Sequence, residues 1–501
     1  MIKYTGTIVQ FGFGAVGKSF FEKVPKEIQF QENRYHVITG NKYEFESYIN
    51  LGGLAPNFHV YEVNQDNFKE IFGSFLKEGD MLIDFADTVG TRDICKWCAE
   101  NNIMYLNTGE ADWPENWYSI FTENLLKTEM KKEYQKDSVH CKHPIILQHG
   151  NNPGLVSHFV KLAIEHVVKK QFRKDKTLNR LLKERNFPEI ARKIGLRMIH
   201  VNDIDLQKTK EKFQENKLVN TWCIDSFFFE LLSEATENIG PHERLKQKDE
   251  YRMLDLDHGF LEYKTMAVDT TCKTYYPGGE FTGYLVPHEE TITIAKSLEI
   301  VENEKNVYRP SVMFIYSPCD IAKKYLETSK VNDYPNPDPM KPLDTENNDG
   351  KTIVRGHVYP SQSEIVYREN IEEGTEYVGV LLLGESFDPV WVGNRIELSY
   401  LYKDKKHSYW QTPTITPVAM SALSALCWMI KHQNQGGIYF PDDIPDYHTI
   451  VKRAEKYISK TIYKTFAKDT IEDKLGIHLS DIQSQDFFAN SNDYMQMNNR
   501  K

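Results

Sequence analysis

Short apolar runs alternate with longer amphipathic segments through the first 150 residues of the chain. The apolar runs predict strands, and the segments whose apolar residues follow a helical spacing predict helices between them. Strands are expected at residues 8–11, 35–39, 59–63, 81–85, 103–106 and 144–148, and helices at 18–30, 67–77, 91–101 and 123–136. Strands that alternate with helices form a parallel sheet covered by helices on both faces. The pattern therefore predicts an α/β fold of the Rossmann type for residues 1–152.

The pattern changes after an amphipathic helix at residues 155–170 and a highly charged segment at 169–192, which we expect to form surface helices. Short β-like runs then follow at residues 197–201, 218–222, 263–267, 283–286, 291–295, 354–359 and 377–383. These runs predict a second, α+β domain over residues 153–410. Within it, residues 334–351 are rich in Pro, Asp and Asn, which predicts a surface loop or a disordered insertion.

An apolar helix rich in small residues is expected at 417–432, and the glycine pair Gly436-Gly437 provides its stop. The helix is too short, and its flanks are too polar, for a membrane span. We predict that it is buried and that residues 411–481 form C-terminal helices that return to the Rossmann domain. The polar tail at 482–501 is expected to fray.

Charge and composition limit the partners of the protein. The 501 residues carry a net charge of −11, which argues against nucleic acid or an anionic membrane as a partner and would suit a cationic ligand. The chain enters a strand directly after its first residues, without the apolar region of a signal peptide, and its seven cysteines are scattered. We therefore expect a cytoplasmic protein.

Cys95 and Cys98 have the C-x-x-C spacing of metal and redox motifs. A closed zinc site needs four ligands, and no second pair follows at a suitable distance. We interpret the two cysteines as one structural face of a helix, and we predict no metal.

A glycine-rich turn joins the first predicted strand to the first helix, in the order Gly12-Phe13-Gly14-Ala15-Val16-Gly17. In a dinucleotide-binding fold the first glycine makes the tight turn, the second admits the pyrophosphate and the third lets helix and strand approach. The phosphates then lie at the helix N-terminus, where unpaired N–H groups favour negative charge. The predicted cofactor-binding residues are Gly12, Gly14, Ala15, Val16, Gly17, Asn41 and Thr108.

The second predicted strand ends in Thr39-Gly40-Asn41-Lys42, where a Rossmann site normally has an acidic residue for the ribose. Lys42 would suit a 2′-phosphate, so the choice between NAD and NADP stays open. Asp87 and Glu110 follow two other predicted strands and could serve the site, a helix cap or a solvated loop. On local grounds, Asn152-Pro153-Gly154 is a turn that begins a helix.

Acidic and aromatic residues gather in the second predicted domain. Trp222 offers an aromatic face to an ammonium ion, and Glu230 lies within an apolar run, where a carboxylate is costly to bury without a cation. Asp203 and Asp225 are further candidates for binding a cationic substrate. His288 and Glu290 lie two residues apart, so on a strand they would share a face and could transfer protons. A solvated helix face and a structural His–Glu pair are the alternatives.

The segments FGFGAVGKSF, GNNPGLVSHFVK, VNTWCIDSFFFE, YLVPHEETITIA and VGVLLLGE, with TPVAMSALSALCWMI near the C-terminus, resemble bacterial homospermidine synthases of the saccharopine-dehydrogenase-like group. They occur in the same order over residues 5–440. The resemblance implies a Rossmann domain, a second α+β domain and a homodimer. It also implies that NAD oxidises putrescine to an imine, that a second putrescine displaces ammonia, and that the same NADH reduces the new imine to sym-homospermidine. Spermidine and diaminopropane are further candidate substrates.

The resemblance assigns roles to single residues. Trp222 would hold a substrate ammonium by a cation–π contact, Glu230 would anchor the inner amine, and Asp203 stands where the family has a glutamate. His288 and Glu290 match the H-x-E of the active site.

In the first domain, Asn152 matches the asparagine of the family's NPG turn, and Asp87 matches an acidic residue. Glu110 lies one register away from the family's glutamate, with Asp112 where a proline is expected. Because of that departure, the match at Glu110 is incomplete. The missing acidic residue after the second strand leaves the choice between NAD and NADP open.

Two other functions fit the fold. A carboxyspermidine- or saccharopine-type dehydrogenase would bind a substrate carboxylate and so needs arginines, but Arg309, Arg355 and Arg395 lie outside the Trp222 and His288 segments in the sequence. A sensor that binds NAD(P) without turnover is the second alternative.

Overall fold

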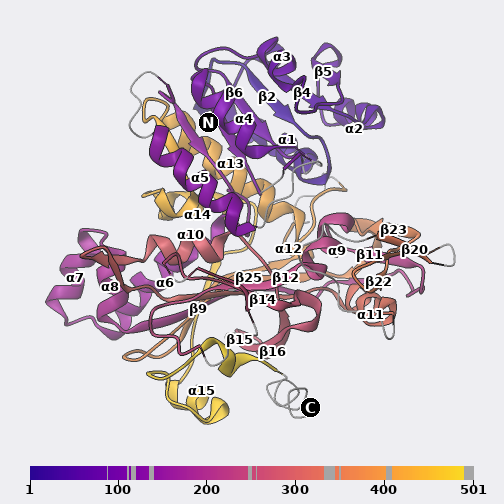
Figure 1. Ribbon diagram of the computed structural model, residues 1–501. Helices are drawn as coiled ribbons and strands as arrows, with labels where there is room; N and C mark the ends of the chain where they lie inside the picture. The colour runs from indigo at the N-terminus through magenta and orange to yellow at the C-terminus, as the bar shows by residue number, and fades with distance from the viewer. Residues whose placement is uncertain are drawn as a thin grey trace. The chain divides into compact units, whose positions relative to one another are not determined.

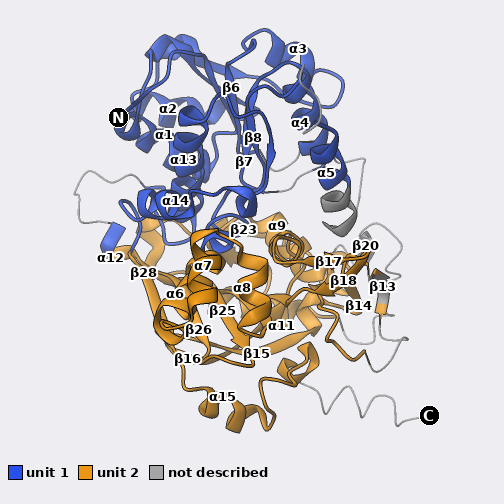
Figure 2. Ribbon diagram, turned by 90° about the vertical axis from the view of Figure 1, so that its left-hand side faces the viewer, with its two compact units in different colours: residues 1–158, 400–459 blue, residues 159–399, 460–501 orange. Residues whose placement is uncertain are grey.

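The chain divides into two compact units in the computed structural model (Figure 2). The first unit comprises residues 1–158 and 400–459, and the second comprises 159–399 and 460–501. The structure describes residues 1–86, 89–109, 112–113, 120–134, 140–245, 251–255, 257–331, 345–348, 351–401 and 409–489. Within these ranges, the helices are all too short or too polar to cross a membrane.

A seven-stranded parallel sheet forms the centre of the first unit. In spatial order its strands are β27 (Gly437–Tyr439), β8 (Pro144–Ile146), β7 (Met104–Asn107), β6 (Met81–Asp84), β2 (Ile8–Phe11), β4 (Tyr35–Thr39) and β5 (Phe58–Val60). Six of these strands reproduce the Rossmann order, in which the strand sequence reverses beside the first strand. All six lie within a few residues of their predicted positions, which confirms the predicted fold.

Helices cover this sheet. They are α1 (Ala15–Glu27), α2 (Phe45–Asn50), α3 (Phe68–Gly73), α4 (Thr91–Glu100), α5 (Ile120–Tyr134), α13 (Ile415–Lys431) and α14 (Tyr447–Ala454). The late helix α13 packs against α1, β7 and β8, and the orange ribbon lies among the indigo and purple elements in Figure 1. Almost every α13 residue is buried, and residues 400–459 belong to the first unit. Cys95 and Cys98 are also fully buried, on the inner face of α4.

A mixed sheet of ten strands organises the second unit. Its main path runs β13 (Tyr251–Asp255), β14 (Phe260–Met266), β12 (Glu234–Asn238), β19 (Ser311–Ser317), β9 (Leu196–Asp205), β25 (Thr375–Gly384), β26 (Val390–Glu397) and β28 (Thr461–Thr465). Of the two remaining strands, β16 (Gly279–Leu285) pairs with β19, and β15 (Thr271–Tyr276) pairs with β16. The parallel pair of β9 and β19 sets Asp203 beside Tyr316.

Helices and small sheets complete the second unit. The helices include α7 (Lys176–Lys183), α8 (Phe187–Lys193), α9 (Ile224–Leu232), α10 (Glu290–Ser297), α11 (Asp320–Ser329) and α15 (Lys468–Leu475), and α6 (Leu155–Gln171) enters from the first unit. β11 (Lys217–Asn220) pairs in parallel with β23 (Gln362–Ile365).

One predicted strand is wrong. Residues 291–295 form helix α10 and not a strand, so His288 and Glu290 do not share a strand face. The apolar side chains Ile292 and Ala295 are buried three residues apart, as a helix requires. Alternating Thr and Ile suit a strand by local preference, but packing of the segment against β19 and β12 selects the helix.

The C-terminal region also differs from the prediction. Residues 460–481 belong to the second unit, because β28 extends its sheet by pairing with β26. The described part of the tail does not fray, since Phe487 is buried and Ser484 donates to Glu243 at 2.8 Å. In the expected loop at 334–351, β20 (Thr345–Asn348) pairs with β21 (Lys351–Val354).

The turn between β2 and α1 depends on close contact between backbone segments. Gly12 has a φ of +87°, which L residues with a side chain rarely adopt. A Cβ on Gly17 would lie 2.5 Å from the Gly12 carbonyl oxygen, whereas a Cβ on Gly14 would meet nothing within 4 Å. Gly17 is therefore required by packing, and Gly14 borders open space.

We predict that Gly17→Ala destabilises the first unit by about 1–3 kcal/mol, because the added methyl group forces the turn away from α1. Gly14→Ala is the matched control and should cost much less, since its methyl group points into open space. Thermal unfolding of both variants measures the difference. Equal unfolding temperatures for the two variants would contradict this packing account.

Candidate functional site

The N-terminus of α1 forms an anion cradle at the carboxyl end of β2. Gly14 is the N-cap residue, and neither a capping side chain nor an acidic residue occupies the first turn of the helix. Its N–H groups and the helix dipole therefore favour an anion. The open space beside Gly14 leaves room for one. The residues of this turn thus fit the pyrophosphate of a dinucleotide.

A carboxylate lies near the end of β4, although the sequence position that normally supplies it is not acidic. Glu44 accepts a hydrogen bond from Thr39 Oγ1 at 2.7 Å, and Lys18 Nζ lies 3.4 Å from its other oxygen. Asn41 makes a local turn by accepting from the N–H of Tyr43 at 3.0 Å. Glu44 is not among the predicted residues, because it lies five residues beyond the end of β4.

The Asn152 turn lies at the carboxyl edge of the same sheet. The N–H of His149 donates to the Asn107 carbonyl at 2.9 Å, at the end of β7. A Cβ on Gly150 would lie 2.9 Å from the Thr108 carbonyl oxygen, so the turn and Thr108 are neighbours. The structure therefore places Asn152 and Thr108 on the edge where a parallel sheet binds its ligand. Asp87 and Glu110 lie outside the described residues.

In the second unit, Trp222 follows β11 and joins a group of aromatic rings. Its indole Nε1 donates to the Tyr316 hydroxyl at 2.8 Å. The rings of Trp222, Phe227 and Tyr316 meet edge to face at centroid distances of 6.0–6.4 Å. Trp222 remains half-buried, so part of its surface is available to a ligand.

His288 lies just before α10 and contacts two carboxylates. Its Nδ1 is hydrogen-bonded to Glu290 and lies 3.2 Å from Glu289. Its ring stacks on Phe314 of β19, with centroids 4.1 Å apart and an interplanar angle of 11°. Burial lowers the pKa of His288, but Glu290, Glu289 and Glu230 together raise it to about 10. The imidazole is therefore a cation at neutral pH.

Glu230 belongs to the same cluster. It projects from α9, whose Phe227, Phe228, Leu231 and Leu232 are buried. Burial raises the pKa of Glu230 to about 8; His288 opposes this shift, and Glu289, Asp203 and Glu290 add to it. Burial also raises the pKa of Glu290. A cation that entered the cluster would favour the ionised form of these carboxyl groups.

The predicted residues of the second unit thus fall into two groups. Asp203, Glu230, His288 and Glu290 interact electrostatically, and Trp222 contacts Tyr316, the strand neighbour of Asp203. Asp225 is exposed at the start of α9, where it accepts from the Tyr359 hydroxyl. Glu289 and Tyr316 were missed by the sequence analysis. The H-E-E sequence offered a signal for Glu289, but none pointed to Tyr316.

The cluster could also bind a metal ion. His288, Glu289 and Glu290 place one ligand atom each within 4.8 Å of one another. The absence of a metal therefore stays a prediction.

Comparisons with known proteins identify relatives of the whole chain and of its first unit. Residues 8–139 match the family described as the saccharopine dehydrogenase NADP binding domain. The chain is 23% identical to the homospermidine synthase of Mesorhizobium japonicum over 445 residues, which cover 86% of this chain and 85% of that protein. It is also 23% identical to the homospermidine synthase of Blastochloris viridis over 495 residues, which cover 96% and 95%.

The fold matches the crystal structure of the homospermidine synthase from Legionella pneumophila in complex with NAD. The TM-score is 0.76 at 22% identity, and the match covers 93% of this chain and 92% of that one. The resemblance predicted from the sequence motifs is therefore confirmed, and so is the expectation of a nicotinamide cofactor. The chain is thus similar over most of its length to homospermidine synthases, and its residues 8–139 match the dinucleotide-binding domain of saccharopine dehydrogenase.

Proposed function

We propose that the protein is an NAD-dependent homospermidine synthase, which converts two molecules of putrescine to sym-homospermidine and ammonia. The observation that carries this proposal is the composition of the acidic cluster, in which Glu230 interacts with one imidazole and three further carboxyl groups. A diamine with two positive charges supplies the cations that such a cluster favours. The homodimer, the cytoplasmic location and the choice of NAD over NADP belong to the same proposal.

The reaction balances without net oxidation. When bound, NAD accepts a hydride from an amine-bearing carbon of putrescine and later returns it. A second putrescine adds its amine to the oxidised carbon, ammonia leaves, and the returned hydride gives the secondary amine of homospermidine. The protein must therefore bind two ammonium groups, remove a proton from a reacting amine and give a proton to the departing nitrogen.

The residues of the cluster suit these tasks. Glu230 binds one ammonium group, and the half-buried face of Trp222 stabilises a cationic nitrogen by a cation–π contact. A carboxyl group with a pKa of about 8 exchanges protons readily near neutral pH, so Glu230 also takes up the proton of an amine. His288 is held protonated by Glu290, so it can supply a proton to leaving ammonia.

The arginines of the second unit argue against a substrate carboxylate. Arg309 lies 3.1 Å from Glu299, and its Nε donates to the Ile239 carbonyl. Arg355 is buried and donates to Glu234 at 3.1 Å and to the Leu232 carbonyl at 2.9 Å. Arg395 pairs with Glu397. These contacts engage the three arginines with groups outside the acidic cluster, which favours a diamine over the amino-acid substrate of a dehydrogenase.

The proposal is tested by incubating the purified protein with putrescine and substoichiometric NAD, with product identification by mass. Many molecules of homospermidine per NAD are expected. In the same assay, Glu230→Gln should lower kcat/KM by about 30-fold or more, because a buried charge partner is lost. Trp222→Phe should cost less than about tenfold and Trp222→Ala more, since phenylalanine keeps part of the cation–π contact.

Glu304→Gln, at an exposed position of the second unit, is the control and should leave turnover unchanged. NADH that accumulates in step with putrescine oxidation would contradict the synthase proposal. Unchanged activity of both Glu230→Gln and Trp222→Ala would remove these residues from the site.

We also predict that diamine binding releases protons. Glu230 has a pKa of about 8 without a ligand, so it is mostly protonated at pH 7, and a bound cation stabilises its ionised form. Putrescine should therefore release close to one proton at about pH 7 and almost none above about pH 9, where Glu230 is already ionised. Calorimetry in buffers of different ionisation enthalpy measures this number. Proton release that persists in Glu230→Gln would contradict the assignment.

A further inference from the structure

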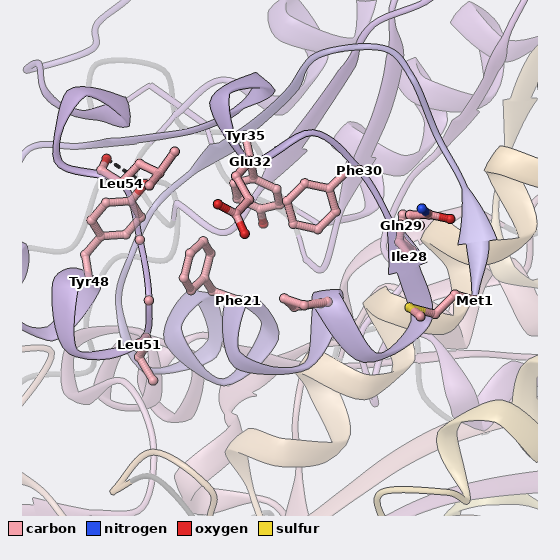
Figure 3. A pocket seen from close by; sticks show the side chains of 13 residues that line it. Met1, Phe21, Ile28, Gln29, Phe30, Glu32, Tyr35, Tyr48, Leu51 and Leu54 are labelled. Carbon is pink, nitrogen blue, oxygen red and sulfur yellow. Dashed lines mark hydrogen bonds between the residues drawn. The ribbon is translucent and has the colours of Figure 1, made fainter.

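A cavity of about 240 Å³ lies within the first unit, away from the glycine turn (Figure 3). It opens to solvent at the exposed residues Met1, Glu32 and Leu54, and it is lined by α1, β3 (Ile28–Gln29), the residues that lead into β4, and α2 with the turn that follows it. Four aromatic rings contribute to its wall, from Phe21, Phe30, Tyr35 and Tyr48. Tyr35 is the first residue of β4, so the cavity lies at the amino ends of the strands, whereas dinucleotides bind at the carboxyl ends.

The hydroxyl groups of the two tyrosines are already hydrogen-bonded. Tyr35 donates to Gln10 Oε1 at 2.7 Å, and Tyr48 donates to the Leu54 carbonyl at 3.2 Å. The tyrosine rings therefore line the cavity while their hydroxyl groups are hydrogen-bonded to the protein. Such a wall attracts apolar groups and cations.

One carboxylate points towards this aromatic space. Figure 3 shows the Glu32 carboxylate directed towards the rings of Phe21 and Tyr35. Among the described residues, the Glu32 side chain has no hydrogen-bond or ion-pair partner. The nearby guanidinium of Arg34 donates instead to the Thr5 carbonyl at 2.5 Å. Aromatic rings combined with a carboxylate form a recognition site for an organic cation.

The volume limits the size of that cation. A water-sized group takes up about 30 Å³, so the cavity holds roughly eight such groups. An aliphatic amine of about four to six carbons fits this space, with its chain against the rings and its ammonium group at Glu32.

The cavity is mechanically connected to the glycine turn by two routes. Phe13, within the turn, packs edge to face against Phe21 and Tyr48, each at a centroid distance of 5.6 Å. Gln10, the hydrogen-bond acceptor of Tyr35, donates to the carbonyls of Gly12 and Gly17, both at 3.0 Å. An occupant that contacts these aromatic rings is thereby linked to the turn that binds the dinucleotide.

We propose that this cavity is a second cation site, where a small aliphatic amine binds and increases the affinity of the glycine turn for its dinucleotide. The amine acts through the contacts that join these aromatic rings to Phe13 of the glycine turn and to Gln10 of β2. The site is separate from the acidic cluster of the second unit, and it does not depend on the proposed reaction.

The test measures binding of butylammonium to the full-length Glu230→Gln protein, in which the acidic cluster is weakened. Calorimetry should show saturable binding, and the dissociation constant for NAD should fall by about fivefold when the amine is present. Butanol, a neutral molecule of the same shape, should have no effect. Glu32→Gln in the same background should abolish both results, whereas Glu46→Gln, at an exposed position of α2 outside the cavity wall, should retain them.

Butylammonium binding that survives Glu32→Gln would overturn the assignment of the site, and so would an absence of saturable binding. An NAD affinity that stays constant while the amine binds would overturn the regulatory role. Homospermidine formation by the single variant Glu32→Gln separates the two proposals, because basal turnover should persist. Loss of diamine turnover in the wild type would count against the proposed reaction alone.

Discussion

The excess of carboxyl groups around His288 determines which protonation states and which ligands the second unit favours. Burial makes ionisation of Glu230 and Glu290 costly, and His288 cannot offset every neighbouring carboxyl group. The cluster holds His288 as a cation, leaves Glu230 protonated near neutral pH and favours a ligand with positive charge at both ends. Ligand binding and proton transfer are therefore expected to be coupled.

The second unit provides this cluster by bringing distant segments together. Its sheet places β9 beside β19, and α9 and the start of α10 contribute the remaining carboxyl groups. In the first unit the backbone alone forms the anion cradle, because Gly17 allows close packing of the turn and Gly14 borders open space. One unit is thus suited to a phosphate anion, and the other to an organic cation.

Local sequence was sufficient to predict the features that depend on local structure. The glycine turn, the parallel strands of the first unit and the buried helix α13 follow from periodicity and turn residues. Local sequence was insufficient for residues 291–295, where a run of five residues suits a strand or a helix and packing decides. It was also insufficient for Tyr316 and Glu44, whose positions depend on contacts with residues elsewhere in the fold.

The central claim is that the hydride removed from an amine-bearing carbon of putrescine returns to that carbon from the same bound cofactor. The test incubates the protein with NAD, excess unlabelled NADH and putrescine that carries two deuterium atoms on each of its two amine-bearing carbons. The account predicts homospermidine with all eight deuterium atoms, because the deuteride never leaves the bound cofactor. Homospermidine with seven deuterium atoms would show that hydride comes from the free NADH pool and would contradict it.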